Sequence, residues 1–173
     1  MEPRHAYCIL CRTGAEEEVK HKVDLFIPQV EALVPTRIIE EKKGKQWRQV
    51  ERPLLPGYIF LYADTELPFD LKWKIHRIYR ILQYEPYYRG LQGEDRDYAF
   101  WVYRHQGQIK PSTIFQEGEK IRVIDGPLLD MNGTITRLDK RHRRVWVSFD
   151  FDGEHRIVSL SAHCITDLDQ MNK

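Results

Sequence analysis

The chain has 173 residues, 42% of them hydrophobic, which suffices for one mid-sized domain or two small domains with a core. Its 27 Lys and Arg nearly balance 26 Asp and Glu, so the net charge of +1 excludes a strongly basic nucleic-acid binder. No apolar run is long enough to span a membrane, and the first residues, MEPRHAYC, lack the apolar core of a signal peptide. We therefore expect a cytoplasmic protein with no membrane partner.

Two of the three cysteines form the pattern Cys8-Ile-Leu-Cys11, which has the spacing of a redox or zinc motif. The odd count gives no disulfide framework, and no second CxxC completes a zinc site. The surrounding HAYCILCR has the apolar and β-branched content of a strand, in which residues three apart point to opposite faces. We expect buried, inert cysteines and neither a metal nor a cofactor.

Strand and helix patterns alternate in the N-terminal part of the chain. A strand is predicted over 5–12, and Thr13 with Glu16 has the capping-box spacing for a helix that Pro28 stops. The further expected elements are a charged hairpin with strands over 34–41 and 46–52 and its turn at 42–45, a central strand over 58–62, a helix over 69–78, a strand over 79–84 and a helix over 94–105. This order predicts an α+β domain over residues 1–106, with an antiparallel sheet and packed helices.

Helical patterns are lost beyond this point. Residues 107–117 are polar, include a proline and predict a flexible linker. Five short strands with tight turns predict a small five-stranded SH3-like β-barrel over 118–173, and Gly126 and Gly133 supply its sharp corners. The expected strands are Lys120–Ile124, Gly133–Leu138, Arg144–Phe149, His155–Leu160 and a piece around Cys164.

Two motifs carry a resemblance to the NusG family of transcription elongation factors. The segment Val123-Ile-Asp-Gly126-Pro127, followed by Asn132-Gly133-Thr-Ile and Leu138-Asp139, is similar to the KOW motif of that family. Upstream, Val34-Pro35-Thr36 and Pro53-Leu-Leu-Pro56-Gly57-Tyr58-Ile-Phe resemble the signature of its NGN domain, and Cys11-Arg-Thr-Gly14 matches its first strand-to-helix turn. The resemblance spans nearly the whole chain, with both motifs in the order of the family.

The resemblance implies a monomeric transcription elongation factor without catalytic chemistry. Its NGN domain would bind the clamp helices of RNA polymerase and suppress pausing and termination. Its KOW domain would reach a second partner, which is Rho, a small-subunit ribosomal protein or nucleic acid. The seven histidines are scattered, and no nucleophile–base or carboxylate pair stands out, which also argues against an enzyme.

The residues carried over from the family as polymerase-binding lie in and around the Pro-Gly-Tyr motif. Pro56, Gly57 and Tyr58 would lie at a hydrophobic cavity that faces the clamp helices, with Tyr7 and Phe60 as neighbours in the sheet. Aromatic anchors dominate the energetics of such interfaces. The alternative is an ordinary core position for the aromatic residues, and strand alternation requires that position for some of them.

A group of four basic residues lies on and just after the expected helix over 69–78. In the family this neighbourhood faces upstream and non-template DNA, so contact with phosphates is one interpretation and a solvated helix face is the other. The residues are Lys72, Lys74, Arg77 and Arg80.

The densest charge is the run Lys140-Arg141-His142-Arg143-Arg144, between the second and third expected barrel strands. Residues 118–173 hold nine Lys or Arg and nine Asp or Glu, so the run is a local concentration in a neutral domain. Such a loop is able to bind RNA or DNA phosphates, and the alternative is a solvated turn. Three further basic residues are expected to flank the run: Lys120, Arg122 and Arg137.

The chain departs from the general factor of the family in the loops of the KOW domain. Leu128 and Met131 stand where that factor tends to carry phenylalanine, and Asp152 lies near its second aromatic position. These departures put coupling to Rho or the ribosome in doubt. They favour a specialised paralogue of the LoaP type, in the RfaH-like group, whose KOW loop contacts a nascent RNA hairpin in selected operons. A general elongation factor and a ribosome-associated KOW protein that binds RNA stay as alternatives, although the latter has no need of an NGN signature.

Overall fold

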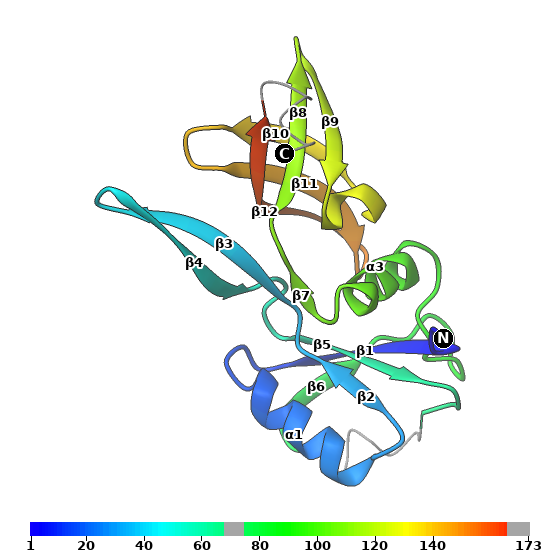
Figure 1. The fold of residues 1–173 in the computed structure, drawn as a ribbon. Helices are drawn as coiled ribbons and strands as arrows, with labels where there is room; N and C mark the ends of the chain where they lie inside the picture. The colour runs from blue at the N-terminus through cyan, green and yellow to red at the C-terminus, as the bar shows by residue number, and fades with distance from the viewer. Residues whose placement is uncertain (68–74, 166–173) are drawn as a thin grey trace. The chain divides into compact units, whose positions relative to one another are not determined.

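The computed structural model describes residues 1–67 and 75–165, which fold into two compact units (Figure 1). The first unit comprises Met1–Thr36 and Pro53–Gly107, and the second comprises Arg37–Arg52 and the chain from Gln108 onward. The segment 37–52 therefore belongs to the second unit, although residues of the first unit flank it on both sides in the sequence. Within the described residues, no helix has the length and apolar character needed to cross a membrane.

The first unit is built on a four-stranded sheet with the order β2-β5-β1-β6. Strand β5 lies inside the sheet, pairs antiparallel with β1 and β2, and is buried along its whole length, as its continuous apolar run predicts. The elements of this unit are β1 (His5–Cys11), α1 (Glu16–Phe26), β2 (Glu31–Leu33), β5 (Tyr58–Ala63), β6 (Ile78–Ile81) and α3 (Gly93–Arg104).

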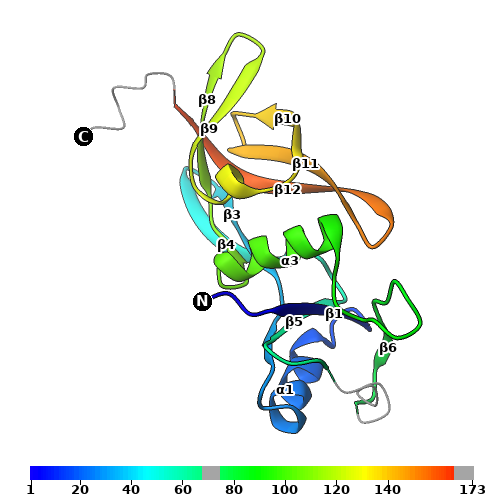
Figure 2. The same ribbon diagram turned by 90° about the vertical axis from the view of Figure 1, so that its right-hand side faces the viewer.

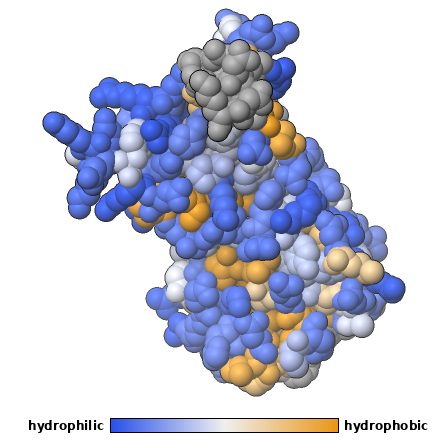
Figure 3. All heavy atoms as spheres, in the orientation of Figure 1, coloured by the Kyte–Doolittle hydropathy of each residue, from blue (hydrophilic) through white to orange (hydrophobic). Residues whose placement is uncertain are grey.

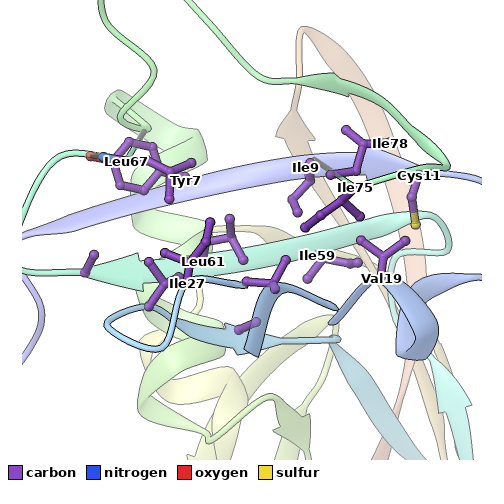
Figure 4. Close-up of a cluster of buried hydrophobic side chains, with 14 of the residues drawn as sticks. Tyr7, Ile9, Cys11, Val19, Ile27, Ile59, Leu61, Leu67, Ile75 and Ile78 are labelled. Carbon is purple, nitrogen blue, oxygen red and sulfur yellow. Dashed lines mark hydrogen bonds between the residues drawn. The ribbon is translucent and has the colours of Figure 1, made fainter. Parts of the chain in front are cut away.

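One face of this sheet packs against α1. Tyr7 and Ile9 of β1 and Ile59 and Leu61 of β5 join Val19 of α1 in a buried cluster (Figure 4). These residues alternate along each strand, so the pleat directs them all to the same face. Each fully buried aliphatic side chain contributes on the order of 1.5–3 kcal/mol, so this cluster is a main source of stability for the first unit.

The opposite face of the sheet is covered by α3, as Figures 1 and 2 show. The ring of Phe60 lies 5.9 Å from that of Tyr98 on α3. The hydroxyl of Tyr62 donates a hydrogen bond of 2.6 Å to the carbonyl oxygen of Ala99. That bond satisfies a phenol in an apolar layer, where an unpaired hydroxyl would be costly. The first unit therefore has three layers: helix, sheet and helix.

The two cysteines of the CxxC pattern confirm the strand interpretation. Cys8 pairs opposite Phe60 and shares its face of the sheet, whereas Cys11 belongs to the cluster on the α1 face. Both thiols are free and buried. Burial, together with the nearby Glu16 carboxylate, raises the pKa of Cys11 to about 11, so its thiol stays protonated and unreactive near neutral pH.

The segment 37–52 forms most of the predicted charged hairpin. Strand β3 (Thr36–Lys43) and strand β4 (Gln46–Pro53) meet at a turn in which Gly44 has a φ of 63°. A short strand, β7 (Gln108–Ile109), pairs with β3 to complete a three-stranded sheet. Hydrophilic residues cover the projecting part of the hairpin in the view of Figure 3.

A curved five-stranded sheet with the order β10-β11-β12-β8-β9 makes up the rest of the second unit (Figure 2). Val145, Val147 and Phe149 of β11 point inward and alternate with less buried residues, as the sequence pattern predicts. Strand β12 pairs antiparallel with β11 and parallel with β8. The elements are β8 (Ser112–Glu117), β9 (Lys120–Asp125), the 3₁₀ turn η1 (Pro127–Asp130), β10 (Thr134–Asp139), β11 (Arg144–Phe151) and β12 (Glu154–Ile165).

The structure departs from the predicted linker over 107–117. Within it, 108–109 form β7 and 112–117 form β8, a strand of the barrel sheet with Ser112 and Ile114 buried. The two strands predicted over 155–160 and around Cys164 are instead parts of the single strand β12. The five-strand prediction is therefore correct in number but not in membership. The polar residues that alternate along β8 conceal its buried face in the sequence.

Two local predictions in the first unit also differ from the structure. Thr13 is not the helix cap, because α1 starts after Ala15 and has no side-chain cap. Strand β2 was not predicted, since its three residues give too little pattern to recognise. Most of the predicted helix over 69–78 lies outside the described residues, and its last residue, Ile78, begins strand β6.

Gly126 illustrates why the corners of the barrel sheet need glycine. Its φ is 96°, and a Cβ at this position would lie 2.7 Å from the Cα of Ser112 on β8. The backbone N–H of Leu128 donates a hydrogen bond of 3.1 Å to the Ser112 hydroxyl, which fixes the turn on that strand. Both the backbone angle and the close approach therefore exclude a side chain here.

We predict that Gly126→Ala destabilises the barrel sheet by more than about 2 kcal/mol, because it combines a positive φ with a backbone clash. Gly153→Ala is the matched control, since Gly153 has a φ of 71° with no atom within 4 Å of the added Cβ. Hydrogen exchange of the β8 and β11 amides measures the difference. Equal exchange in the two variants would show that the close approach to Ser112 has no energetic weight.

Candidate functional site

The Pro-Gly-Tyr turn is clamped between the end of β1 and the start of α1. Gly57 has a φ of 86°, its carbonyl accepts a 2.7 Å hydrogen bond from the Cys11 amide, and its own amide donates one of 2.7 Å to Glu16. The other carboxylate oxygen of Glu16 accepts a 2.7 Å hydrogen bond from the Gly14 amide. A Cβ on Gly57 would lie 3.0 Å from the Cys11 carbonyl oxygen. This turn is therefore held rigidly, and only glycine suits its second position.

The five expected polymerase-binding residues do not share one surface. Pro56 is exposed, whereas Gly57 is buried and Tyr58 is only 7% exposed. Tyr7 lies on the α1 face, where its hydroxyl accepts a hydrogen bond from the Leu67 amide, and Phe60 lies on the α3 face.

The pairing of β1 with β5 explains this separation. Tyr7 pairs opposite Leu61, and Phe60 pairs opposite Cys8, so Tyr7 and Phe60 point to opposite faces of the sheet. The structure favours the alternative of an ordinary core position for both residues, which are neighbours in the sheet but face opposite sides of it. The exposed part of the motif is Pro56.

The two described residues of the expected basic helix face, Arg77 and Arg80, do not lie on a helix. Arg77 has a φ of 77°, and its guanidinium forms an ion pair of 2.7 Å with Glu18 at the start of α1. Arg80 is exposed on strand β6, where it pairs opposite Leu10. Lys72 and Lys74 lie outside the described residues. Arg77 therefore links two elements of the first unit, whereas Arg80 is at its surface.

Two exposed tyrosines in the first unit were not predicted as candidate site residues. Tyr79 of β6 is 57% exposed, and Tyr87 in the following loop is 87% exposed. Exposed aromatic rings are typical of interfaces. The available signal was the density of tyrosine between residues 79 and 88, but periodicity alone does not show which rings face outward.

The basic run of the second unit begins in a turn held by Asp139. This carboxylate accepts a 3.0 Å hydrogen bond from the amide of His142 and contacts its ring Nδ1 at 2.7 Å. Those hydrogen bonds lower the pKa of Asp139, so the carboxylate stays ionised at neutral pH. Arg143 follows with a φ of 52°, which reverses the chain into β11.

The last two residues of the basic run contact the β3–β4 hairpin through Glu40, which is only 8% exposed. One Glu40 carboxylate oxygen lies 3.5 Å from the Arg143 guanidinium and 2.7 Å from His163 Nε2. Arg144 donates a 3.1 Å hydrogen bond to the Glu40 carbonyl, and desolvation lowers its pKa. A buried carboxylate requires partners such as Arg143 and His163, and Arg144 satisfies the backbone carbonyl of the same residue, so both arginines have a structural role here.

Further hydrogen bonds join the hairpin to β12. The amide of Glu40 donates a 2.8 Å bond to the Ser161 hydroxyl. Arg37 donates to the carbonyl and, at 3.0 Å, to the hydroxyl of Ser159. The guanidinium of Arg143 also lies 4.1 Å from the ring centroid of Trp47 on β4. The hairpin thus adds side chains to the surface beside the basic run.

The remaining basic residues divide into two groups. Lys140, Arg141 and His142 are exposed, and neither Lys140 nor Arg141 forms an ion pair within the described part of the chain. Arg137 lies 4.5 Å from the ring centroid of Trp146 on the neighbouring strand. Two others belong to β9, which is at the other end of the sheet order from β10: Lys120 and Arg122.

The loop positions that depart from the general factor are not equivalent. Leu128 is buried in η1, where its amide bonds to Ser112, whereas Leu129 is 58% exposed. Asp152 has a φ of 54° and turns β11 into β12. The buried Leu128 is therefore a packing residue and not an exposed contact.

Comparison with known proteins identifies the family. A family model described as transcription termination factor NusG matches residues 4–87. The transcription termination/antitermination protein NusG of Escherichia coli K12 is 31% identical over 156 residues, which cover 86% of this chain and 83% of that protein. The chain belongs to the NusG family.

Other members of the NusG family also match this chain over most of its length. NusG of Helicobacter pylori strain 26695 is 25% identical over 163 residues, covering 89% of this chain and 93% of that protein. A solved structure titled "Domain interaction in Thermotoga maritima NusG" matches 91% of this chain and 93% of that one, with a TM-score of 0.50 and 20% identity. The predicted combination of an NGN domain and a five-stranded KOW domain is therefore confirmed.

We predict that Glu16→Ala loosens the Pro-Gly-Tyr turn by about 2 kcal/mol, because two backbone N–H groups lose a charged acceptor. Glu17→Ala removes an equal charge from the same first turn of α1 and serves as the control. Hydrogen exchange at the Gly57 amide is the measurement. Exchange as slow in Glu16→Ala as in the control would rule out the clamp.

Proposed function

We propose that this protein is a transcription elongation and antitermination factor that binds RNA polymerase through its first unit. In this proposal it acts at selected operons as a specialised paralogue of the LoaP type. Relatives that match most of the chain are named transcription termination/antitermination proteins. The main support for polymerase binding by the first unit is the exposure of Pro56. This residue lies on a turn that hydrogen bonds to Glu16 and Cys11 hold rigid.

Rigid presentation suits an interface, because a turn that is already ordered loses little conformational entropy when it binds. In this proposal the surface around Pro56 meets the clamp helices. Tyr58 follows Pro56 and Gly57 as a buried residue, since only 7% of it is exposed. Arg80 is the candidate for contact with non-template DNA in the described part of the first unit, because it is exposed on β6.

The second unit would contact nascent RNA through Lys140, Arg141 and His142. These side chains are exposed, and the two cationic ones have no ion-pair partner among the described residues. Unpaired cations at a fixed turn are suited to phosphate oxygens. The proposed RNA contact is thus narrower than the full run, because Arg143 and Arg144 are committed to Glu40.

The second candidate is a general elongation factor that couples polymerase to Rho or a small-subunit ribosomal protein. The family relationship favours it as strongly as it favours a specialised paralogue. The KOW loops count against it, since Leu128 is buried and Asp152 is a turn residue with a positive φ. A ribosome-associated KOW protein is disfavoured by the match of the family model to residues 4–87.

We predict that Pro56→Asp weakens binding to purified RNA polymerase by about tenfold or more, because it places a charge in an apolar interface. Pro53→Asp is the matched control, since Pro53 is also exposed and the change is the same. Titration of each labelled variant with polymerase gives the two dissociation constants, and thermal unfolding verifies that both variants are folded. Equal dissociation constants would place the polymerase interface elsewhere.

A further inference from the structure

We propose that the second unit holds one nucleotide of a single-stranded nucleic acid in a cavity between the β3–β4 hairpin and the basic run. In this site the phosphate contacts Lys42 and Arg141, and the base stacks beside Trp47. The inference rests on the proposed contact with RNA and adds the hairpin to it, which the NusG relationship does not assign.

The cavity has a volume of about 460 Å³. That volume falls within the range of about 300–1,000 Å³ typical of small-ligand pockets, so one nucleotide is an appropriate occupant. Both the hairpin and the basic run contribute to its wall. The lining residues are Glu40, Glu41, Lys42, Gly44, Trp47, Arg141, His142 and Arg144.

The two acidic residues in this wall are already neutralised. Glu41 forms ion pairs with Arg52 at 3.2 Å and Arg48 at 3.7 Å, both on β4 and outside the lining. Glu40 is held by Arg143 and His163, which also lie outside the lining. The carboxylates therefore do not compete for the cations that face the cavity.

Two of the cations in the wall remain available for a ligand, whereas Arg144 donates to the Glu40 carbonyl. Lys42 and Arg141 form no ion pair within the described parts of the chain. They approach the cavity from different elements, Lys42 from β3 and Arg141 from the turn after β10. Two cations that come from different elements and line one cavity suit a phosphodiester, whose oxygens accept hydrogen bonds from several directions.

Trp47 gives the cavity its second property, an aromatic surface. It is half-buried on β4, and the Arg143 guanidinium lies 4.1 Å from its ring centroid. That cation–π contact restrains the ring before any ligand arrives. Stacking of a base on an aromatic side chain is worth about 1–3 kcal/mol, and it is available only for an unpaired base. The aromatic surface therefore favours single-stranded nucleic acid over an acidic peptide.

The cavity is pre-formed because the hairpin is fixed to β12. Ser161 accepts the Glu40 amide hydrogen bond at 2.8 Å, and His163 contacts the Glu40 carboxylate at 2.7 Å. The hairpin and the basic run are thus both anchored through Glu40, which lowers the entropic cost of ligand binding. Glu40 acts here as a positioning residue.

The test measures binding of the full chain to a fluorescently labelled RNA transcribed from the leader of its own operon. We expect Lys42→Ala and Arg141→Ala each to weaken binding about fivefold or more, and to lower the slope of log K against log salt by about 0.7. Lys43→Ala is the matched control, because Lys43 is the adjacent exposed lysine and does not line the cavity. Its affinity is expected to stay within about twofold of the parent protein.

Trp47 supplies an independent readout that charge alone would not change. Bound RNA is expected to quench tryptophan fluorescence in the parent protein, and Trp47→Phe is expected to lose that quenching while it retains most of the affinity. Unlabelled single-stranded DNA of the same sequence, added as a competitor, distinguishes a site for either nucleic acid from one that requires RNA.

The outcomes separate the inference from the function on which it rests. If the parent protein binds no leader RNA, the proposed RNA contact and the inference both fail. If Arg141→Ala weakens binding, but Lys42→Ala keeps the affinity of Lys43→Ala and Trp47→Phe keeps the fluorescence quenching, the RNA contact stands and the hairpin site is overturned. Displacement of RNA by a polyglutamate peptide, with the same dependence on Lys42, would overturn nucleic acid as the ligand class.

Discussion

The buried carboxylate of Glu40 is the contact on which the second unit depends. The carboxylate lies between Arg143 and His163, and the Glu40 backbone N–H donates to the Ser161 hydroxyl, so this residue joins an inserted hairpin to the barrel strand β12. A carboxylate removed from water is stable only with such partners, so the contact specifies one arrangement of the hairpin and the basic run. Glu40 also determines which cations remain available for a ligand, because Arg143 contacts its carboxylate and Arg144 donates to its backbone carbonyl.

Much of the fold could be predicted from the sequence because its signals are local. The continuous apolar run of β5, the spacing in α3 and the alternation in β11 depend on neighbours within the same segment. The strand β8 was mistaken for a linker because its buried side consists of only two residues, one of them a serine. The function of the basic run was harder to predict, since Glu40 precedes Arg143 by 103 residues and no pattern connects them.

The positions of the aromatic residues in the first unit also depend on contacts between segments distant in the sequence. Pro56 was predicted at a surface and is exposed, while Tyr7 and Phe60 are core residues on opposite faces of one sheet. Alternation predicts that neighbouring strand residues separate, but the register between β1 and β5 decides which face each residue takes. Membership of the NusG family therefore establishes the fold, and the polymerase and RNA contacts follow as proposals from the exposed residues.

Transcription by purified RNA polymerase through an intrinsic terminator, with and without this protein, tests whether it is an antitermination factor recruited by its own leader RNA. One template carries the leader of the protein's own operon, and a second carries an unrelated leader before the same terminator. We expect increased readthrough only on the first template, because the second unit is proposed to capture RNA from that leader. Equal effects on both templates, or changed pausing without readthrough, would contradict it and indicate a general elongation factor.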